Sequence, residues 1–471
     1  MAARAAPHRP APAAGRRGEA GHLHRRPHPR RDHRRAHHRA DRRAQDREPR
    51  LAGARTRHPG RGAQGNRARQ GEEPLTTPEE AARLDAEDEL AAFRDRFVPI
   101  TDESVVAYLD GNSLGRPLRA TADRLREVVA EQWGARLIRS WEERWLELPE
   151  RIGDELGRVA LGAAPGQTIV ADSTSVCLYK VLRAAVALRP GRDELVTDTA
   201  NFPTDRFLVD SVGAELGLTV RWIEGPDDVA AVAGPRTAAV VLSHVDYRSA
   251  AIADLAGITR VVHERGGLTV WDLCHSVGSI PVALDADGAD FAVGCTYKFL
   301  NAGPGAPAFL YVNARHHEAF GQPITGWMGA ADTFGMAERY VPAPGIRRAL
   351  SGTPPVLGMV GVQEGVALLA EAGIERVRAK AVALGRWVLD LADEWLVPLG
   401  FTVASPREDA RRGGHVTLRH PDAERLSRVL IDNGVLIDFR RPDGIRIGLS
   451  PLTTGFTEVR AAMERIRELA G

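Results

Sequence analysis

The sequence contains few cysteines, few aromatic residues and no long apolar run, and each scarcity narrows the possible classes of protein. Its three cysteines, Cys177, Cys274 and Cys295, are an odd number and show no CxxC spacing, which argues against a disulfide framework and a zinc site. No apolar run approaches the roughly 20 residues of a membrane-spanning helix. We therefore expect a cytoplasmic protein with no metal and no membrane association.

The net charge of +1 conceals a division along the chain. Residues 1–75 contain 20 Arg, no Lys and seven Asp or Glu, whereas the remainder contains 43 basic and 55 acidic residues. Because Arg, His, Pro, Ala and Gly dominate residues 1–75, we predict a disordered tail there. A nucleic-acid-binding arm and a targeting peptide are alternatives; a solvated tail, arising from a start codon assigned too early, is favoured. The acidic remainder gives no reason to expect nucleic-acid binding.

Strand-like and helix-like segments alternate through the first part of the acidic region. Short apolar runs predict strands at 105–109, 168–171, 194–197, 218–223, 238–243, 268–272, 291–294 and 308–312. Helical patterns lie between them at 120–132, 150–162, 175–188, 205–216 and 254–265. This alternation is typical of an α/β fold with a mostly parallel sheet covered by helices on both faces.

A segment rich in Gly and Pro, Gly345 to Pro355, marks a boundary. Beyond it we predict helices at 356–372, 374–396, 422–433 and 455–470, with strands at 400–404, 415–419, 435–439 and 444–448. These elements predict a smaller C-terminal α+β domain at 341–471, after an N-terminal segment and large domain at 76–340. Order is expected to begin at Thr77, which opens a capping box.

Two titratable residues follow apolar runs in the large domain. Asp272 ends the run LTVW, and Lys298 follows a second run, with His275 and Tyr297 beside them. Ligand sites of α/β sheets lie at the carboxyl ends of the strands, so we expect these side chains to meet. An acid that holds a pyridinium nitrogen and a lysine that forms a Schiff base are the groups that a pyridoxal phosphate enzyme requires. Lysine is scarce in this Arg-rich chain, and Arg cannot replace it in that reaction.

Two strand-to-helix junctions are candidates for cofactor contacts. In the first, Thr174 and Ser175 are predicted to cap a helix whose N-terminus binds phosphate, although an ordinary cap without a ligand is the alternative. In the second, Phe202 could stack on a flat ring and Asp205 could accept a hydrogen bond. An aromatic core residue beside a turn is the alternative for Phe202.

Three further residues carry polar groups suited to anions. Trp327 and Thr353 lie in glycine-bearing loops and offer donors to a phosphate. Arg446 lies on an apolar strand, where a buried guanidinium requires an anion. That anion is either a substrate carboxylate or the partner in an internal salt bridge.

Together the segments DGNSLG (110–115), NFPTD (201–205), WDLCHSVG (271–278), CTYKFLNAGPG (295–305), GW (326–327) and APGIRRALSGTPP (343–355) resemble kynureninase, over roughly residues 80–471. The resemblance implies the fold-type-I pyridoxal phosphate fold of the aspartate aminotransferase superfamily. It implies hydrolytic cleavage of the Cβ–Cγ bond of L-kynurenine or 3-hydroxykynurenine, which yields anthranilate or 3-hydroxyanthranilate and L-alanine. It also implies a place in tryptophan catabolism, the kynurenine pathway or NAD biosynthesis.

The resemblance also implies roles for individual residues. Lys298 looks like the Schiff-base lysine, Asp272 the partner of the ring nitrogen with His275 beside it, and Tyr297 a candidate general acid or base. Further implied cofactor contacts are Thr174, Ser175, Phe202, Pro203, Thr204, Asp205, Ser243, Trp327 and Thr353. Arg446 matches the clamp for the substrate carboxylate, and Ser113 and Trp141 fall where the family lines its substrate pocket. Because the family draws phosphate ligands from both subunits, a homodimer is implied.

Two positions depart from the family pattern, and other classes of protein stay open. Cys177 stands where Asn is usual, and Cys274 where Ala is usual. An aminotransferase or a cysteine desulfurase on the same fold is the nearest alternative. A catalytically silent scaffold, or a regulator whose basic tail binds nucleic acid, is an alternative from a different class.

Overall fold

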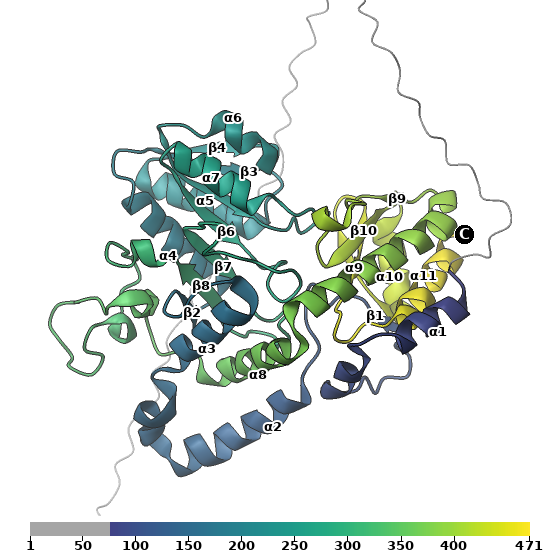
Figure 1. Ribbon diagram of the computed structural model, residues 1–471, viewed down its shortest axis with the longest axis horizontal. Coiled ribbons are helices and arrows are strands. Elements are labelled where there is room, and N and C mark those ends of the chain that lie inside the picture. Colours follow the sequence, from purple (N-terminus) through teal and green to yellow (C-terminus); the bar gives the residue numbers. More distant parts are fainter. Residues whose placement is uncertain (1–75) are drawn as a thin grey trace, which may run out of the picture. The chain divides into compact units, whose positions relative to one another are not determined.

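The computed structural model describes residues 76–471, and the predicted disordered tail at 1–75 lies outside the described residues. Its largest sheet has seven strands in the order β2-β8-β7-β6-β5-β3-β4 (Figure 1). The strands are β2 (Thr168–Ala171), β3 (Glu194–Asp198), β4 (Thr219–Ile223), β5 (Thr237–Ser243), β6 (Leu268–Asp272), β7 (Phe291–Gly294) and β8 (Ala308–Val312). Only the two pairs that involve β8 are antiparallel, so the prediction of a mostly parallel sheet is confirmed.

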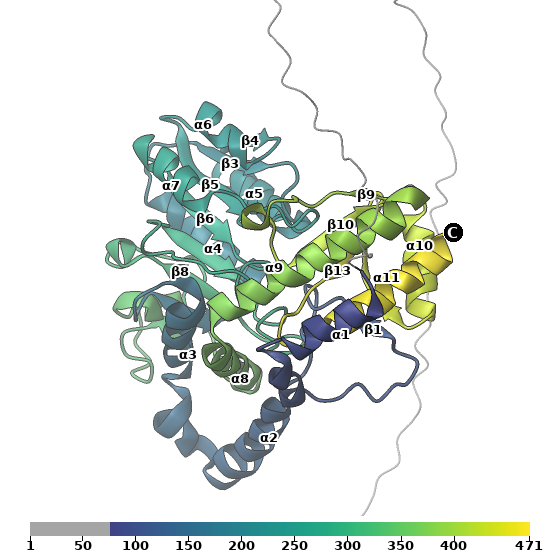
Figure 2. The ribbon, with the colours of Figure 1, turned by 45° about the vertical axis from the view of Figure 1, so that its right-hand side comes forward.

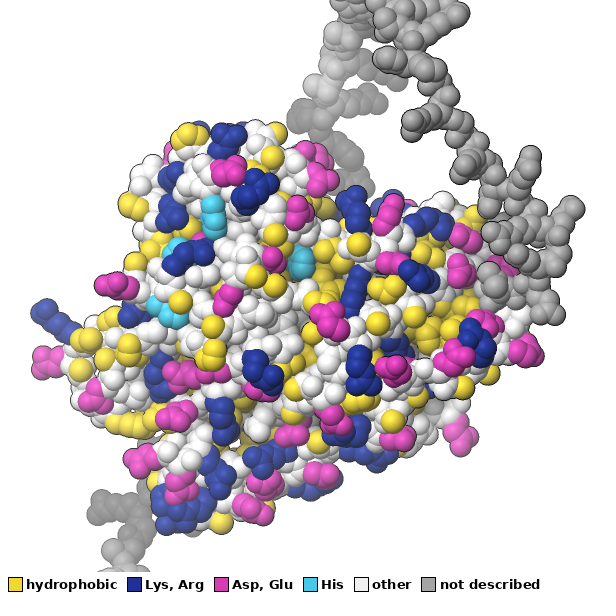
Figure 3. Space-filling view, viewed as in Figure 1, with side chains coloured by type: hydrophobic (Ala, Val, Ile, Leu, Met, Phe, Trp, Pro, Cys, Tyr) yellow, Lys and Arg dark blue, Asp and Glu magenta, His cyan; other side chains and the backbone are white. Residues whose placement is uncertain are grey.

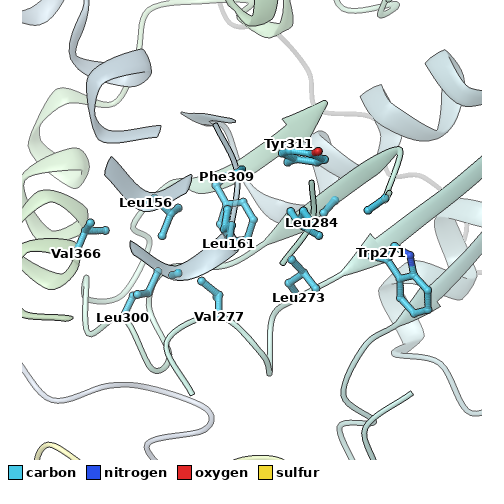
Figure 4. Packing of buried hydrophobic residues seen from close by; sticks show 14 of the residues in the cluster. Leu156, Leu161, Trp271, Leu273, Val277, Leu284, Leu300, Phe309, Tyr311 and Val366 are labelled. Atoms are coloured by element: carbon cyan, nitrogen blue, oxygen red, sulfur yellow. The ribbon is translucent and has the colours of Figure 1, made fainter. Parts of the chain in front are cut away.

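Helices cover both faces of this sheet, as the alternating pattern predicts. One face packs against α4 (Thr174–Ala187) and α5 (Pro203–Leu216). The other face packs against α3 (Leu148–Leu156), α6 (Val229–Val232), α7 (Leu255–Glu264) and α8 (Val356–Ala372). Figure 4 shows part of the core on this second face, where Leu273 lies among leucine and valine side chains and Trp271 lies at one side of them. Strands buried on both faces require such continuous apolar runs.

A separate four-stranded antiparallel sheet has the strand order β12-β13-β10-β9. Its strands are β9 (Thr402–Val403), β10 (His415–Arg419), β12 (Asp438–Arg440) and β13 (Gly444–Gly448), and β1 (Ala107–Tyr108) pairs separately with β11 (Val435–Leu436). One apolar core joins this sheet and these strands to α1 (Pro78–Ala86), α9 (Ile374–Leu391), α10 (Ala423–Asp432) and α11 (Phe456–Ala470). Figure 2 shows α1 beside α11. The N-terminal segment therefore shares a core with the C-terminal elements, while the division at 340/341 stays a prediction.

One predicted helix boundary is confirmed and two others need correction. Thr77 caps α1 as predicted, because its Oγ1 accepts the N–H of Glu80. The cap of α4 is Ser173, whose Oγ accepts the N–H of Val176, so Thr174 and Ser175 occupy the first helical turn instead. The predicted helix 120–132 divides into α2 (Arg119–Glu127) and a π-helical segment at 128–135. Periodicity detects a helix but does not distinguish its hydrogen-bond register.

Within residues 76–471, no single helix is long and apolar enough to cross a membrane. Helix α8 and the following helical run 374–399 reach that length and composition only as a pair bent by 82°.

Candidate active site

A pocket opens at the carboxyl edge of the seven-stranded sheet, where the sequence predicts it. It is lined by Thr174, Ser175, Phe202, Thr204, Asp205, Ser243, Tyr247, Asp272, Cys274, His275, Tyr297 and Lys298. All of these except Tyr247 and Cys274 are predicted site residues. The parallel strands explain the convergence, because β3, β5, β6 and β7 end at the same edge and each is followed by a polar loop.

The loop before α4 is held in an uncommon conformation. Asp172 has φ 49°, which places a non-glycine residue in the left-handed region. The Nζ of Lys180, a fully buried lysine, donates to Asp172 Oδ2 at 2.7 Å and to the carbonyl of Ala349 at 2.7 Å. This ion pair fixes the turn that presents Thr174 and Ser175, and with them the free N–H groups of the first helical turn, to the pocket.

Lys298 and His275 are in direct contact. Lys298 Nζ lies 3.0 Å from His275 Nε2. Burial, and then the charge of Lys298, lowers the pKa of His275 well below its usual range, so the imidazole stays neutral and its Nε2 can accept a hydrogen bond from the lysine. Behind the lysine, the N–H of Gly115 donates to the carbonyl of Tyr297 at 2.8 Å. A Cβ at position 115 would lie 2.3 Å from the Lys298 carbonyl oxygen, so only glycine fits there.

Two buried carboxylates lie side by side in the floor of the pocket. Asp272, 7% exposed, accepts the N–H of Cys274 at 2.7 Å. Within the described residues, no donor contacts Oδ2 of Asp205, which is 3% exposed. Burial and the neighbouring Asp272 carboxylate raise the pKa of Asp205 well above its usual range. Since neither acid forms an ion pair within residues 76–471, the pocket is suited to receive a positively charged group.

The wall of the pocket is formed by Phe202 and residues near it. Phe202 is 36% exposed and meets Tyr247 edge to face at 5.2 Å, so the alternative of an aromatic core residue does not hold. Ser243 Oγ donates to Asn201 Oδ1 at 2.8 Å. Pro203 occupies the first turn of α5 and does not line the pocket. Tyr297 is half-buried, and burial raises the pKa of its hydroxyl, which therefore stays protonated at neutral pH.

Arg446 lies beside this pocket and already has an anionic partner. Its guanidinium is 1% exposed and donates to the Tyr247 carbonyl at 2.8 Å, to Ser113 Oγ at 2.9 Å and to Asp438. The structure thus contains the internal salt bridge that the sequence leaves open as an alternative, and it brings Ser113 to Arg446.

Three predicted site residues lie away from the pocket. Trp141 and Thr353 line a separate apolar pocket with Trp133 and Trp145, and Trp327 is 37% exposed. The loop of Trp327 is joined to the loop of Thr353 by a hydrogen bond from the N–H of Met328 to the carbonyl of Ser351, at 3.2 Å. These residues form one surface unit that does not reach Lys298 within the described chain.

Sequence reasoning missed Tyr247, Asp438 and His415. Tyr247 and Asp438 contact Arg446, and His415 is fully buried 5.7 Å from the ring of His275. Tyr247 follows the end of β5, and that position was an available signal. The other two depend on strand pairing that the sequence does not display. Among residues 76–471, no cluster of three His, Cys, Asp or Glu residues could hold a metal ion.

Comparison with known proteins bears directly on this geometry. The sequence-family model that describes the kynureninase C-terminal domain matches residues 377–466 of this chain. A kynureninase of Pseudomonas fluorescens is 40% identical over 403 residues, which cover 84% of this chain and 96% of that protein. A kynureninase of Burkholderia pseudomallei (strain 1106a) is 38% identical over 402 residues, with the same coverage. This chain belongs to the kynureninase family.

Solved structures extend the likeness at the level of the fold. The apo cysteine desulfurase of Thermococcus onnurineus NA1 has a TM-score of 0.69 at 19% identity and covers 80% of this chain and 97% of its own. A C-DES mutant with glycine covalently linked to its PLP cofactor has a TM-score of 0.70 at 18% identity and covers 80% of this chain and 99% of its own. At these identities they show that the kynureninase-family chain has the predicted fold-type-I architecture.

Proposed function

We propose that this protein is a kynureninase that uses pyridoxal phosphate to hydrolyse the Cβ–Cγ bond of L-kynurenine, 3-hydroxykynurenine or both. The products are anthranilate or its 3-hydroxy form and L-alanine. The observation that carries the proposal is the convergence of Lys298, His275 and the Asp205–Asp272 pair in one pocket of a kynureninase-family chain.

The residues of the pocket fit the cofactor. The Asp205–Asp272 pair, which forms no ion pair among the described residues, suits a protonated ring nitrogen, the first turn of α4 suits a phosphate, and Lys298 Nζ is available for an aldehyde carbon. Ser243, Thr204 and the exposed face of Phe202 complete the lining. When bound, pyridoxal phosphate joins the substrate amine covalently and withdraws electrons from its α and β carbons.

The proton transfers belong to residues of the chain. Lys298 Nζ, held by neutral His275, removes a proton from the substrate α carbon. Tyr297, whose hydroxyl keeps its proton, supplies a proton to Cβ, which stays in the alanine product when the Cβ–Cγ bond breaks and the acyl group passes to water. Arg446 holds the substrate carboxylate, with Ser113 beside it.

Trp327, Thr353 and Trp141 support a homodimer, because the single described chain leaves them outside the Lys298 pocket. Exposed apolar side chains accompany them in the segments 129–138 and 324–341, where Ile138 and Met336 are 76% and 75% exposed. Yellow side chains gather over the second segment at the left edge of Figure 3. Such surfaces are typical of subunit interfaces. We propose that each subunit donates these loops to the pocket of its partner.

Mixed dimers test this arrangement. Lys298→Ala and Thr353→Ala subunits, each inactive alone, should regain activity when refolded together, because each hybrid dimer then contains one pocket with both residues intact. Hybrids that stay inactive would place Thr353 outside the partner's site.

The proposed cytoplasmic location is supported by three thiols that form no disulfide, Cys177, Cys274 and Cys295.

An aminotransferase and a cysteine desulfurase are less well supported. A desulfurase requires a reactive thiol on an accessible loop, whereas all three cysteines are buried. The solved desulfurases share only the fold with this chain.

The decisive experiment incubates the purified holoenzyme with L-kynurenine and measures anthranilate fluorescence and L-alanine, which should form in equal amounts. Borohydride reduction then locates the lysine that binds the cofactor. Because the chain contains only Lys180, Lys298 and Lys380, the labelled peptide gives an unambiguous answer. A label on Lys180 or Lys380, or turnover without anthranilate, would refute the proposal.

A further inference from the structure

Asp438 and Arg446 face each other across two strands. They are Cα partners in the antiparallel ladder of β12 and β13, and their side chains form a buried ion pair. Nη2 of Arg446 donates both to Asp438 Oδ2 and to Ser113 Oγ. Since Nη2 carries two hydrogens, both are committed.

This commitment conflicts with bidentate binding of a carboxylate. A guanidinium grips a carboxylate through Nη1 and Nη2 at its end, or through Nε and Nη2 at its side. Both arrangements require a hydrogen of Nη2. Nε of Arg446 has no partner among the described residues, so the side arrangement lacks only Nη2. A substrate carboxylate must therefore displace either Asp438 or Ser113.

Asp438 is the group that can leave, because it has a second cation. Nη2 of Arg440 lies 3.0 Å from the same Oδ2, and Arg440 is 36% exposed. Release from Arg446 therefore leaves the carboxylate of Asp438 paired. Ser113 Oγ, 3.4 Å from Asp438 Oδ2, is neutral, so it can remain on Arg446 without repelling an incoming carboxylate.

We propose that Asp438 occupies the place of the substrate carboxylate on Arg446 and moves to Arg440 when substrate binds. The inference rests on the proposed function, since it takes the α-carboxylate of an amino acid as the ligand of Arg446. Asp438 then sets the affinity for that carboxylate by competition and is a specificity-determining residue. Arg440 keeps the displaced acid paired.

The test is calorimetric titration of the holoenzyme with L-alanine and with ethylamine, which is L-alanine without its carboxylate. Asp438→Asn removes the competing charge and should tighten L-alanine binding about five-fold, as loss of one ion pair predicts, while ethylamine binding stays unchanged. Asp443→Asn is the matched control, because Asp443 pairs with Arg419 at 3.6 Å on the same hairpin and should change neither ligand.

A second variant has the opposite expected sign. Arg440→Gln removes the alternative partner of Asp438 and should weaken L-alanine binding without changing ethylamine binding. Unchanged or weaker L-alanine binding in Asp438→Asn, with unchanged circular dichroism, would overturn the inference. Because binding is measured without turnover, that outcome is distinct from a failure to release anthranilate, which would refute the proposed function.

Discussion

Two buried acidic sites lie at opposite edges of the seven-stranded sheet, one at the amino ends of its parallel strands and the other at their carboxyl ends. At the amino end of β7, Asp290 is contacted by His263 and His316 at 2.7 Å, by Arg315 at 2.6 Å and by the N–H of Thr269 at 2.8 Å. At the carboxyl edge, Asp205 lies beside Asp272. Burial acts against both acids, but the donors around Asp290 lower its pKa, whereas the pKa of Asp205 is raised. The fold completes the pairing of one acid and leaves the other to a ligand.

Asp272→Asn, at the carboxyl edge of the sheet, should have the largest effect of these substitutions, and that effect should be on turnover. Loss of the charge opposite the ring nitrogen should reduce turnover by about 10²–10³-fold, measured as anthranilate release. Asp290→Asn, assayed where it remains folded, should keep turnover near that of the unaltered protein. A comparable loss in Asp290→Asn would erase the distinction between the two ends.

Asp290→Ala, at the amino end of β7, should lower the stability of the folded protein. Removing this acid leaves two histidines and an arginine without their anion, so the free energy of unfolding should fall by about 3 kcal/mol. Urea unfolding followed by circular dichroism measures the change. A loss below about 1 kcal/mol would show that the cluster is not structural.

Asp205→Asn, unlike Asp290→Ala, should raise the stability of the cofactor-free protein. Because the substitution relieves repulsion between two buried acids, the apoprotein should gain about 1 kcal/mol of stability, measured by urea unfolding. Asp210→Asn, an exposed position on the same helix α5, is the matched control and should change nothing. An unchanged or less stable Asp205→Asn apoprotein would mean that Asp205 is already satisfied.

The stabilities of the Asp290→Ala and Asp205→Asn variants, each compared with the unaltered apoprotein, should depend on pH in different ways. Asp290, with its lowered pKa, contributes stability that is fully present above the unfolded-state pKa of about 3.9 and is lost only as pH falls through its much lower folded-state pKa. Asp205, with its raised pKa, imposes a penalty that grows as pH rises above about 3.9. The Asp205→Asn difference from the unaltered apoprotein should therefore shrink toward zero by about pH 3, whereas most of the Asp290→Ala difference should remain at that pH. An Asp205→Asn difference that persists at about pH 3 would assign that difference to packing, and an Asp290→Ala difference that vanishes by that pH would contradict the lowered pKa of Asp290.

The sequence predicted most of this sheet because buried strands leave a local record. The runs ending at Ala171, Asp272, Gly294 and Val312 match β2, β6, β7 and β8 residue for residue. Parallel topology then brought Asp272 and Lys298 together without further information. The Asp438–Arg446 pair was hidden because it depends on the register of β12 and β13.

Other site features were beyond local patterns. Whether Trp327 and Thr353 serve their own chain's pocket depends on distances across the fold, which spacing along the chain does not contain. Ser173 was missed as the cap of α4 because three consecutive hydroxyl residues, 173–175, offer equivalent caps by composition. The choice among them is made by the backbone of Asp172.

The turn at 110–115 contacts both charged residues assigned to an amino acid substrate. Ser113 contacts the guanidinium of Arg446, and Gly115 is bonded to the peptide that precedes Lys298. The spacing between the amine-binding and carboxylate-binding groups is therefore set by the six backbone residues of this turn, which lies outside either sheet. Inserting one residue into this turn would alter which amino acids fit, with every catalytic side chain left in place.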